Sequence, residues 1–305
     1  MTPNPAHGTP AGDATLAIRA LARRSGRDVQ ELMTLYTLEG LLARIALSEH
    51  RDDFVLKGGV LLAAFAARRA TRDIDLQATR LSDAPDEVTE LVRTTAGIDI
   101  GDGLAFDPAS VTATTIRDED EYAGVRVKLT AMLGTSRLTI GIDVNFGDPI
   151  WPVPRFIELP RVIPIGLPPV KVLGYPLTMV LAEKLVTAID RGTANTRWRD
   201  FADVYTLGRL HSIDAAELRA SLETVADYRD VALVPLLPAL APMNELAQQK
   251  YRAWRTRVHR ESELPVQFRD VLGSVARFAD PVLTDKSARR WDPRRSVWTN
   301  RSANE

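Results

Sequence analysis

Asp73 and Asp75, two aspartates separated by one residue, are the side chains in this sequence best suited to chemistry. They lie in residues 73–78, where polar residues alternate with apolar ones as in a half-buried strand. Residues i and i+2 of a strand project from the same face, so the two carboxylates repel each other unless a cation lies between them. Hard divalent cations such as Mg²⁺ bind oxygen ligands of this kind. The pair therefore predicts a metal site, and Asp143, on a later apolar strand, is a candidate third ligand.

Two adjacent glycines, Gly58 and Gly59, precede the aspartate pair with thirteen residues between them. They follow a short apolar strand that ends at Lys57, and an Ala- and Leu-rich stretch, residues 60–70, predicts a helix of three turns after them. Glycines let the backbone approach a ligand closely, and free amides at a helix start can hold phosphate. This order of elements favours a site for a nucleotide phosphate and a metal. The alternative is a plain turn followed by a solvent-facing acidic pair.

The composition excludes several other kinds of active site. The 305 residues include no cysteine, which excludes disulfides, thiol nucleophiles, iron–sulfur clusters and Cys-ligated zinc. The sequence has no P-loop or dinucleotide-binding motif, and its four histidines are unpaired, which argues against a zinc site or a histidine-based triad. With 45% hydrophobic and 26% charged residues, the chain has the composition of a soluble globular protein. It shows no membrane-length apolar stretch and no signal peptide, so we expect no membrane association and a cytoplasmic location.

The elements that must position these side chains follow from the periodicity of the sequence. After a Pro-rich N-terminus, residues 1–12, which we expect to be disordered, the pattern predicts helices at 13–25, 28–49 (with Asp28 as its N-cap) and 83–96, then a polar loop and strands at 125–131 and 138–144. Eight prolines in residues 149–176 predict a surface connector with one or two edge strands. Beyond it the pattern is helical, at 177–191, 199–210, 214–226, 242–259 and 264–278.

Lysine is scarce in this chain, with six lysines against 33 arginines. Each retained lysine is therefore of interest, because an ammonium acts as a compact point charge. Lys57 lies beside the glycine pair and Lys184 lies in an apolar helix. The alternative for Lys184 is a lysine that snorkels to the surface or pairs with a glutamate. Asp200 and Asp203 share a helical face on which Asp203 can orient a cation.

The C-terminal part of the chain is basic, with 13 Lys and Arg against 7 Asp and Glu in residues 250–305. Four of these cations are candidate RNA contacts: Lys250, Arg252, Arg255 and Arg257. Such a stripe can follow a phosphate backbone while Tyr251 and Trp254 stack on exposed bases. The alternative is a solvated helix face whose two aromatic side chains pack inward.

Six segments in this order and spacing resemble the AbiEii/AbiGii nucleotidyltransferase toxins of type IV-like toxin–antitoxin systems, within the polymerase-beta-like superfamily. The segments are Val55-Leu56-Lys57-Gly58-Gly59, Thr71-Arg72-Asp73-Ile74-Asp75-Leu76, Tyr122-Ala123-Gly124-Val125-Arg126-Val127, Ile142-Asp143-Val144-Asn145-Phe146-Gly147-Asp148, Ala182-Glu183-Lys184-Leu185 and Asn195-Thr196-Arg197-Trp198-Arg199-Asp200-Phe201-Ala202-Asp203. They span residues 55–203, and the remainder of the chain adds little to the match.

The resemblance implies an α+β fold with a polymerase-beta-like nucleotidyltransferase core, a mixed sheet flanked by helices, followed by a helical C-terminal domain. The pattern of elements and the distribution of charge place the core with its N-terminal helices at 13–165, the helical domain at 166–285 and a basic tail at 286–305. The implied catalytic residues are Lys57, Asp73, Lys184 and Asp200, with Asp203 in support. Those implied to bind the nucleotide are Lys57, Gly58, Gly59, Arg72 and Lys184, the metal ligands are Asp73, Asp75 and Asp143, and Arg197 and Arg199 are further candidate RNA contacts.

The implied activity is that of a toxin of EC class 2.7.7. With Mg²⁺ or Mn²⁺ it would transfer a nucleoside monophosphate from an NTP to tRNA 3′ ends, block translation and be neutralised by a cognate antitoxin. One alternative is a transferase on the same fold that modifies a protein hydroxyl. The other is a catalytically inactive regulator that binds NTP or RNA.

Overall fold

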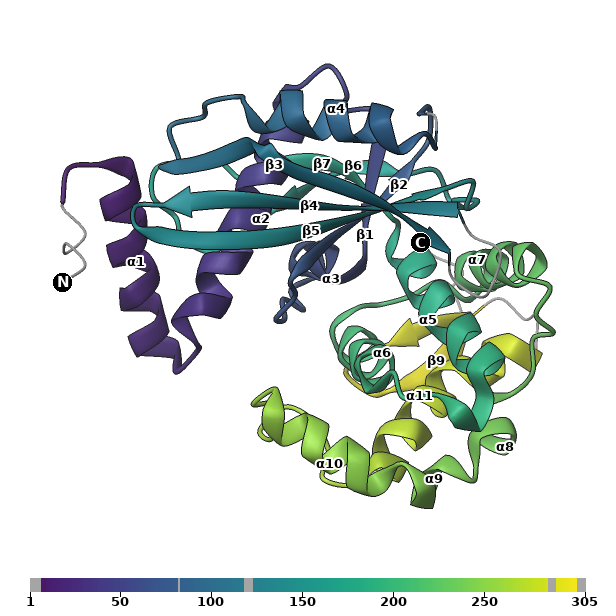
Figure 1. The fold of residues 1–305 in the computed structure, drawn as a ribbon. Helices are drawn as coiled ribbons and strands as arrows, with labels where there is room; N and C mark the ends of the chain where they lie inside the picture. The colour runs from purple at the N-terminus through teal and green to yellow at the C-terminus, as the bar shows by residue number, and fades with distance from the viewer. Residues whose placement is uncertain (1–6, 82, 118–122, 285–288, 301–305) are drawn as a thin grey trace. The chain divides into compact units, whose positions relative to one another are not determined.

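The computed structural model describes residues 7–81, 83–117, 123–284 and 289–300. The chain forms two compact units: unit 1 comprises Met1–Asp148 and Pro154–Tyr175, and unit 2 comprises Pro149–Val153 and Pro176–Glu305. Unit 1 contains the large sheet and unit 2 is mainly helical, as expected (Figure 1). The expected boundary after residue 165 lies ten residues too early, because Val170–Gly174 is a strand of the unit 1 sheet.

The sheet of unit 1 has seven strands in the order β3-β4-β5-β2-β1-β7-β6. Their bounds are β1 (Phe54–Lys57), β2 (Asp73–Ala78), β3 (Leu104–Arg117), β4 (Ala123–Leu133), β5 (Ser136–Phe146), β6 (Arg155–Leu159) and β7 (Val170–Gly174). The sheet is mixed, because β2 pairs parallel to β5 and β1 parallel to β7, while the other neighbours are antiparallel. The strand with the two aspartates therefore lies at the centre of the sheet, between β5 and β1.

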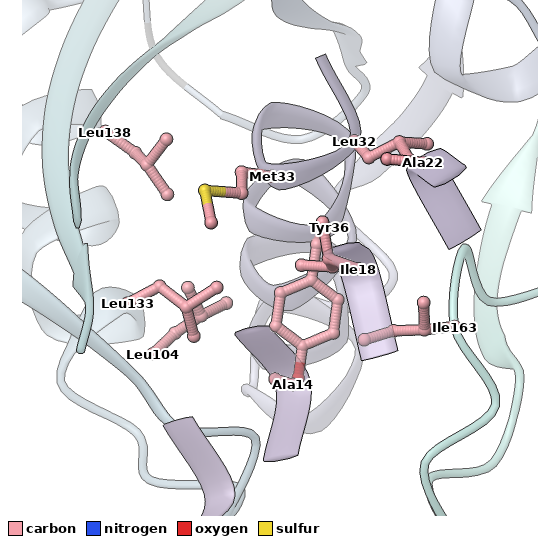
Figure 2. Close-up of a cluster of buried hydrophobic side chains, with 10 residues drawn as sticks. All are labelled: Ala14, Ile18, Ala22, Leu32, Met33, Tyr36, Leu104, Leu133, Leu138 and Ile163. Carbon is pink, nitrogen blue, oxygen red and sulfur yellow. The ribbon is translucent and has the colours of Figure 1, made fainter. Parts of the chain in front are cut away.

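Helices α1 (Pro10–Ser25), α2 (Val29–Leu47) and α4 (Pro85–Ala96) pack beside this sheet, α2 against β5 and β7 and α4 against β3 (Figure 1). Asp28 caps α2 as expected, since its side chain accepts a hydrogen bond from the Glu31 amide. Figure 2 shows the apolar cluster that joins α1 and α2 to the ends of β3, β4 and β5, made of Ala14, Ile18, Ala22, Leu32, Met33, Tyr36, Leu104, Leu133, Leu138 and Ile163.

Three expectations for unit 1 were wrong. The helix expected over residues 60–70 ends early, since α3 (Gly58–Leu61) and the 3-10 helix η1 (Leu62–Phe65) stop at Ala66, whose φ is 54°. The expected polar loop contains β3, a long strand paired with β4. Helix α1 begins at Pro10, within the N-terminus expected to be disordered, while residues 1–6 lie outside the described residues. The connector 149–176 does contain two strands, but only β6 lies at the sheet edge.

Unit 2 is built from α5 (Leu177–Arg191), η2 (Gly192–Ala194), α6 (Trp198–Leu210), α7 (Ala215–Tyr228), α8 (Leu236–Leu240), α9 (Met243–Leu246), α10 (Gln248–Arg257) and α11 (Phe268–Thr284). Phe268 is an aromatic centre, with ring centroids 5.3–5.4 Å from those of Trp198, Phe201 and Tyr251. The expectation that the chain ends in a tail was wrong for residues 289–300. These residues form a hairpin of β8 (Arg289–Asp292) and β9 (Val297–Asn300). Within the described ranges, no helix is long and apolar enough to cross a membrane.

Candidate active site

The glycine pair forms a tight turn between β1 and α3 that faces the second aspartate. Gly58 has a φ of +66°, which few residues other than glycine adopt readily. A β-carbon at Gly58 would lie 1.8 Å from Asp75 Oδ2, and the Gly59 amide donates a hydrogen bond to the same oxygen at 3.3 Å. The turn therefore depends on glycine for its backbone conformation and for the space that Asp75 occupies.

A row of four charged residues crosses the sheet at this level. In the strand register, Lys57 pairs with Asp75, Asp75 pairs with Asp143, and Asp143 pairs with Arg126. Paired residues on neighbouring strands project from the same face, and the strands lie about 4.8 Å apart. The charges therefore follow the order +, −, −, + across β1, β2, β5 and β4, with the two carboxylates adjacent.

Of the two adjacent carboxylates in this row, Asp75 is the one that is unfavourable to ionise. Burial and the neighbouring Asp143 raise the pKa of Asp75, while the Gly59 amide, Lys57 and Arg69 act in the opposite direction. Asp143 is compensated by Arg126, whose Nε and Nη2 donate to Asp143 Oδ1 and Oδ2 at 2.7 and 2.6 Å. This ion pair raises the pKa of Arg126 above its ordinary value. Asp75 is thus the carboxylate that a bound cation would stabilise most.

Asp73 is the exposed member of the pair and lies two residues away on the same strand face. Its register partner is Gly141 on β5, where a β-carbon would lie 2.1 Å from Asp73 Oδ1. Between the two aspartates, Ile74 is fully buried, which anchors β2 against the core of unit 1. The strand therefore presents Asp73 to solvent and leaves Asp75 half-buried.

The donor set on β2 fits a hard divalent cation that takes its other ligands from water and substrate phosphates. Asp73 and Asp75 supply carboxylate oxygens on one face, and the missing β-carbons of Gly58 and Gly141 leave the space that these two side chains occupy. Among the described residues, no group of three or more His, Cys, Asp or Glu side chains is arranged to hold a metal ion. Since Arg126 holds both oxygens of Asp143, the third carboxylate stays a prediction.

Lys57 is held by two groups that the sequence did not indicate. Its Nζ donates to Asp148 Oδ2 at 2.9 Å and lies 5.4 Å from the centre of the Tyr175 ring. With its side-chain amide oriented to satisfy both ends, Gln77 donates to Asp148 Oδ2 at 3.0 Å and accepts from the Gly147 and Asp148 amides. The alternation that places Asp75 also places Gln77 on this face, but only the fold brings Asp148 to it. The Lys57 side chain is 9% exposed, so this lysine is largely enclosed.

Arg72 and the predicted RNA contacts Arg197 and Arg199 have exposed side chains. Arg72 directly precedes Asp73, and its carbonyl accepts a hydrogen bond from the Gly141 amide at 3.5 Å. Arg197 Nε lies 3.0 Å from Asp200 Oδ2. Their predicted roles in binding phosphate and RNA stay predictions.

In unit 2, Lys184 on α5 lies between the two aspartates of α6. Its Nζ donates to Asp200 Oδ1 and to Asp203 Oδ2, both at 2.9 Å. The side chains are largely buried, with 11%, 11% and 2% exposure for Lys184, Asp200 and Asp203. Lys184 therefore pairs with two aspartates, where the alternative named a glutamate, and Asp203 contacts it as predicted. The catalytic role of Lys184 stays a prediction.

Lys184→Ala is expected to lower the free energy of unfolding by about 3 kcal/mol, because it leaves Asp200 and Asp203 buried together without a cation. Adding Asp203→Asn should recover part of this loss by removing one of the two charges. Urea unfolding of both variants measures the difference, with Lys250→Ala on an exposed helix face as the control. Equal stability of the single and double variants would contradict the account.

The basic stripe on α10 is only partly available to a ligand. Lys250, Arg252 and Arg257 are exposed, but Arg255 is 8% exposed and donates to the Leu264 and Glu261 carbonyls at 3.2 and 2.8 Å. Arg255 is therefore a structural residue, and its assignment as an RNA contact was wrong.

Of the two interpretations of Tyr251 and Trp254, inward packing is the one that the structure shows. Both side chains are buried, at 0% and 5% exposure, and Tyr251 packs on the ring of Phe268. A helix with inward-packed aromatic residues and a solvated basic face is the observed arrangement.

Comparison with known proteins gives one family and several similar solved structures, two of which follow. JHP933 from Helicobacter pylori is 14% identical, with 87% of this chain and 90% of that chain covered and a TM-score of 0.45. A "putative nucleotidyltransferase" from H. pylori is also 14% identical, with 78% and 98% covered and a TM-score of 0.43. No curated protein matches. The profile described as "Nucleotidyl transferase AbiEii toxin, Type IV TA system" matches residues 40–279, which include the glycine turn, the aspartate pair and the Lys184 cluster. The chain therefore belongs to the AbiEii nucleotidyltransferase toxin family.

Proposed function

We propose that this toxin transfers a nucleoside monophosphate from an NTP to the 3′ hydroxyl of tRNA in a metal-dependent reaction, and thereby blocks aminoacylation and translation. The membership of the chain in a nucleotidyltransferase family sets the reaction class. The observation that supports metal dependence is the position of Asp73 and Asp75 on one face of β2, beside the Gly58–Gly59 turn. The excess of basic residues in 250–305 supports a nucleic acid as the acceptor.

In the proposed reaction the acceptor oxygen forms a bond to the α-phosphorus, and the bond from that phosphorus to the β-bridging oxygen breaks. Pyrophosphate leaves with the electron pair of the broken bond, and the proton of the acceptor hydroxyl passes to water. Asp73 and Asp75 would hold a divalent cation. When bound, the cation supplies positive charge that offsets the negative charge of the triphosphate and of the leaving pyrophosphate. The Gly58–Gly59 turn lets the triphosphate approach the backbone closely.

The remaining predicted residues contribute positive charge and orientation. Lys57 is oriented by Asp148 and presents its ammonium beside Asp75. For Lys184 and Asp200 the family resemblance supports a catalytic role, and their short contacts in unit 2 support a fixed orientation. The protein's partner is an antitoxin, as its membership in a type IV toxin–antitoxin family implies.

The experiment that tests the function supplies each α-labelled NTP to purified protein with Mg²⁺ or with EDTA. Intact tRNA, tRNA whose terminal diol has been oxidised with periodate, and total cell protein are offered as separate acceptors. We expect label in intact tRNA alone, only with metal, and none with Asp73→Asn. Label confined to protein would replace tRNA by a protein hydroxyl as acceptor. Absence of label in every pool, with growth inhibition retained by Asp73→Asn, would favour an inactive binding protein.

The exposed cations of α10 give a prediction about RNA affinity. Joint substitution of Lys250, Arg252 and Arg257 by glutamine is expected to weaken tRNA binding about tenfold at low salt and to flatten its salt dependence, because three phosphate contacts are lost. Filter binding over a range of salt concentrations measures both quantities. An unchanged salt slope would remove α10 from the RNA-binding surface.

A further inference from the structure

The segment after η1 turns back toward the glycine pair instead of continuing as a helix. The Ala67 amide donates to the Leu62 carbonyl at 2.9 Å, and Ala66 has a positive φ, so the helical path ends there. In a continuous helix, Arg69 would lie about 15 Å along the axis from Gly59, because the rise is about 1.5 Å per residue. The observed reversal removes this separation.

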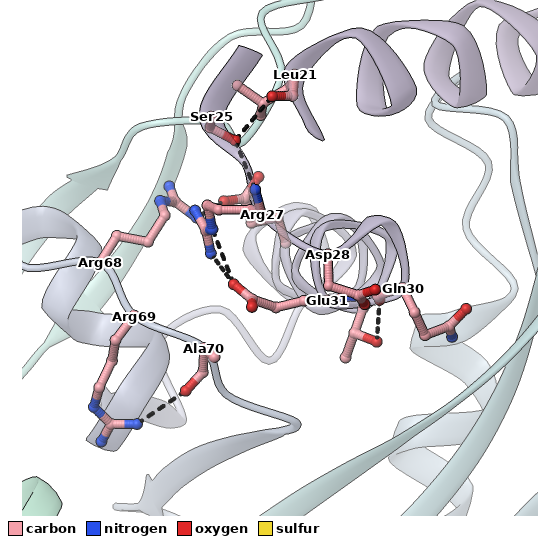
Figure 3. A network of polar contacts seen from close by, with 11 residues as sticks. Leu21, Ser25, Arg27, Asp28, Gln30, Glu31, Arg68, Arg69 and Ala70 are labelled. Carbon is pink, nitrogen blue, oxygen red and sulfur yellow. Dashed lines mark hydrogen bonds and ion pairs between the residues drawn. The ribbon is translucent and has the colours of Figure 1, made fainter. Parts of the chain in front are cut away.

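Arg69 consequently lies against the glycine turn. A β-carbon at Gly59 would lie 3.1 Å from Arg69 Nη1 and 2.9 Å from Thr71 Oγ1. The same Nη1 donates to the Ala70 carbonyl at 3.2 Å, which fixes the direction of the side chain (Figure 3). Arg69 as a whole residue is half-buried.

Two neighbouring cations of unit 1, Arg68 and Lys57, make contacts elsewhere. Arg68 donates to the Glu39 carboxylate and to the Pro160 carbonyl, which ties this segment to α2 and to the chain before β7. Figure 3 shows the Arg68 and Arg69 side chains extending in different directions from this segment. Lys57 is enclosed with Asp148. The omission of a β-carbon at Gly59 leaves the space in which the Arg69 guanidinium lies against the turn.

We propose that the Arg69 guanidinium, together with the Gly58–Gly59 turn, binds phosphate oxygens of the NTP. The inference deepens the proposed function and rests on it for the identity of the ligand as a nucleoside triphosphate. A guanidinium presents several N–H groups in a planar fork that matches two phosphate oxygens, which an ammonium cannot do. The charge of Arg69 acts on Asp75, whose pKa it lowers against the effect of burial.

The test compares Arg69→Gln and Arg69→Lys with Arg80→Gln, an exposed arginine beyond the other end of β2 that pairs with Asp53. Two quantities are measured: the KM for NTP in the transfer assay, and the Kd for inorganic tripolyphosphate by calorimetry, which needs no acceptor. Arg69→Gln is expected to raise both about 10- to 100-fold, as the loss of charge-assisted hydrogen bonds implies. Arg69→Lys should restore part of the affinity, and Arg80→Gln should leave both quantities unchanged.

The outcomes separate this inference from the proposed function. If wild-type protein transfers no nucleotide but binds tripolyphosphate through Arg69, the phosphate site stands and the transfer reaction falls. If transfer occurs and neither quantity changes in Arg69→Gln, the inference is overturned while the function stands. A fall in melting temperature in Arg69→Gln with no loss of tripolyphosphate affinity would also overturn it, because the role of Arg69 would then be structural.

Discussion

The Asp75→Asn variant is expected to lose nucleotidyl transfer by at least about 1000-fold, while its folded state is as stable as wild type or more stable. The activity falls because one carboxylate of the metal-binding pair is removed, and a metal ion supplies several kcal/mol of transition-state charge stabilisation. The stability holds because the charge of Asp75 is unfavourable in the free protein, where burial and Asp143 raise its pKa. Transfer assays and urea unfolding measure the two effects.

The direction of the pH dependence follows from the raised pKa of Asp75. A carboxyl group whose folded-state pKa exceeds its unfolded value stabilises the fold fully below the unfolded pKa and loses that contribution as pH rises through the folded pKa. The stability advantage of Asp75→Asn over wild type should therefore be largest above the folded-state pKa of Asp75, where the wild-type carboxyl group is charged. Saturating Mg²⁺ should raise the melting temperature of wild type and not of the variant.

Asp83→Asn is the matched control, because Asp83 is an exposed aspartate shortly after β2. It should keep activity, stability and the response to Mg²⁺. The account of the pair would fail if Asp75→Asn retained more than about a tenth of the activity, since a loss below tenfold corresponds to under 1.4 kcal/mol. It would also fail if the variant were markedly less stable than wild type, since the buried charge would then be favourable.

Gly58→Ala is expected to abolish activity and to lower the free energy of unfolding by about 2–4 kcal/mol, the sum of left-handed backbone strain and overpacking. Two physical effects coincide at this position. Its φ is +66°, and the new methyl group would lie 1.8 Å from Asp75 Oδ2. The carboxylate must move, so the metal ligand loses its position even if the turn survives. Transfer assays and urea unfolding report the two consequences.

Gly101→Ala isolates the steric effect from the backbone effect. Gly101 has a nearly equal φ of +70°, and a β-carbon there would meet no atom within 4 Å. This control should cost about 1 kcal/mol from backbone strain alone and leave transfer unchanged. If both variants kept full activity, the close approach of Gly58 to Asp75 would have no part in catalysis.

The features that the sequence predicted well are those that depend on residues close together in the chain. The period-2 alternation of 73–78 places both aspartates on one strand face, and most of the expected helices, including α2, α5 and α6, match the structure closely. Each of these follows from side-chain direction or from burial of one helix face, which short-range spacing determines. The order of segments also pointed to the family, which the profile over residues 40–279 confirms.

The same local reasoning failed where a contact across the fold outweighs local propensity. Residues 60–70 favour helix by composition, but the chain reverses at Ala66, which lets Arg68 reach Glu39 and the Pro160 carbonyl. Residues 104–117 lack a clear apolar alternation, yet they pair with β4 along most of its length. Arg255 reads as a surface cation, but the carbonyls of the following loop hold it inside.

By itself, the sequence determined that a glycine turn precedes a strand with two carboxylates on one face. The shared face follows from the strand alone, because residues i and i+2 project from the same side whatever surrounds them. The tertiary structure alone decided the partners of these groups. Asp143 faces Arg126 and Lys57 faces Asp148 because of strand register and long-range chain return. Arg69 lies at the turn because a helix stops early. Register and reversal are set by the packing of distant segments, which local spacing does not encode.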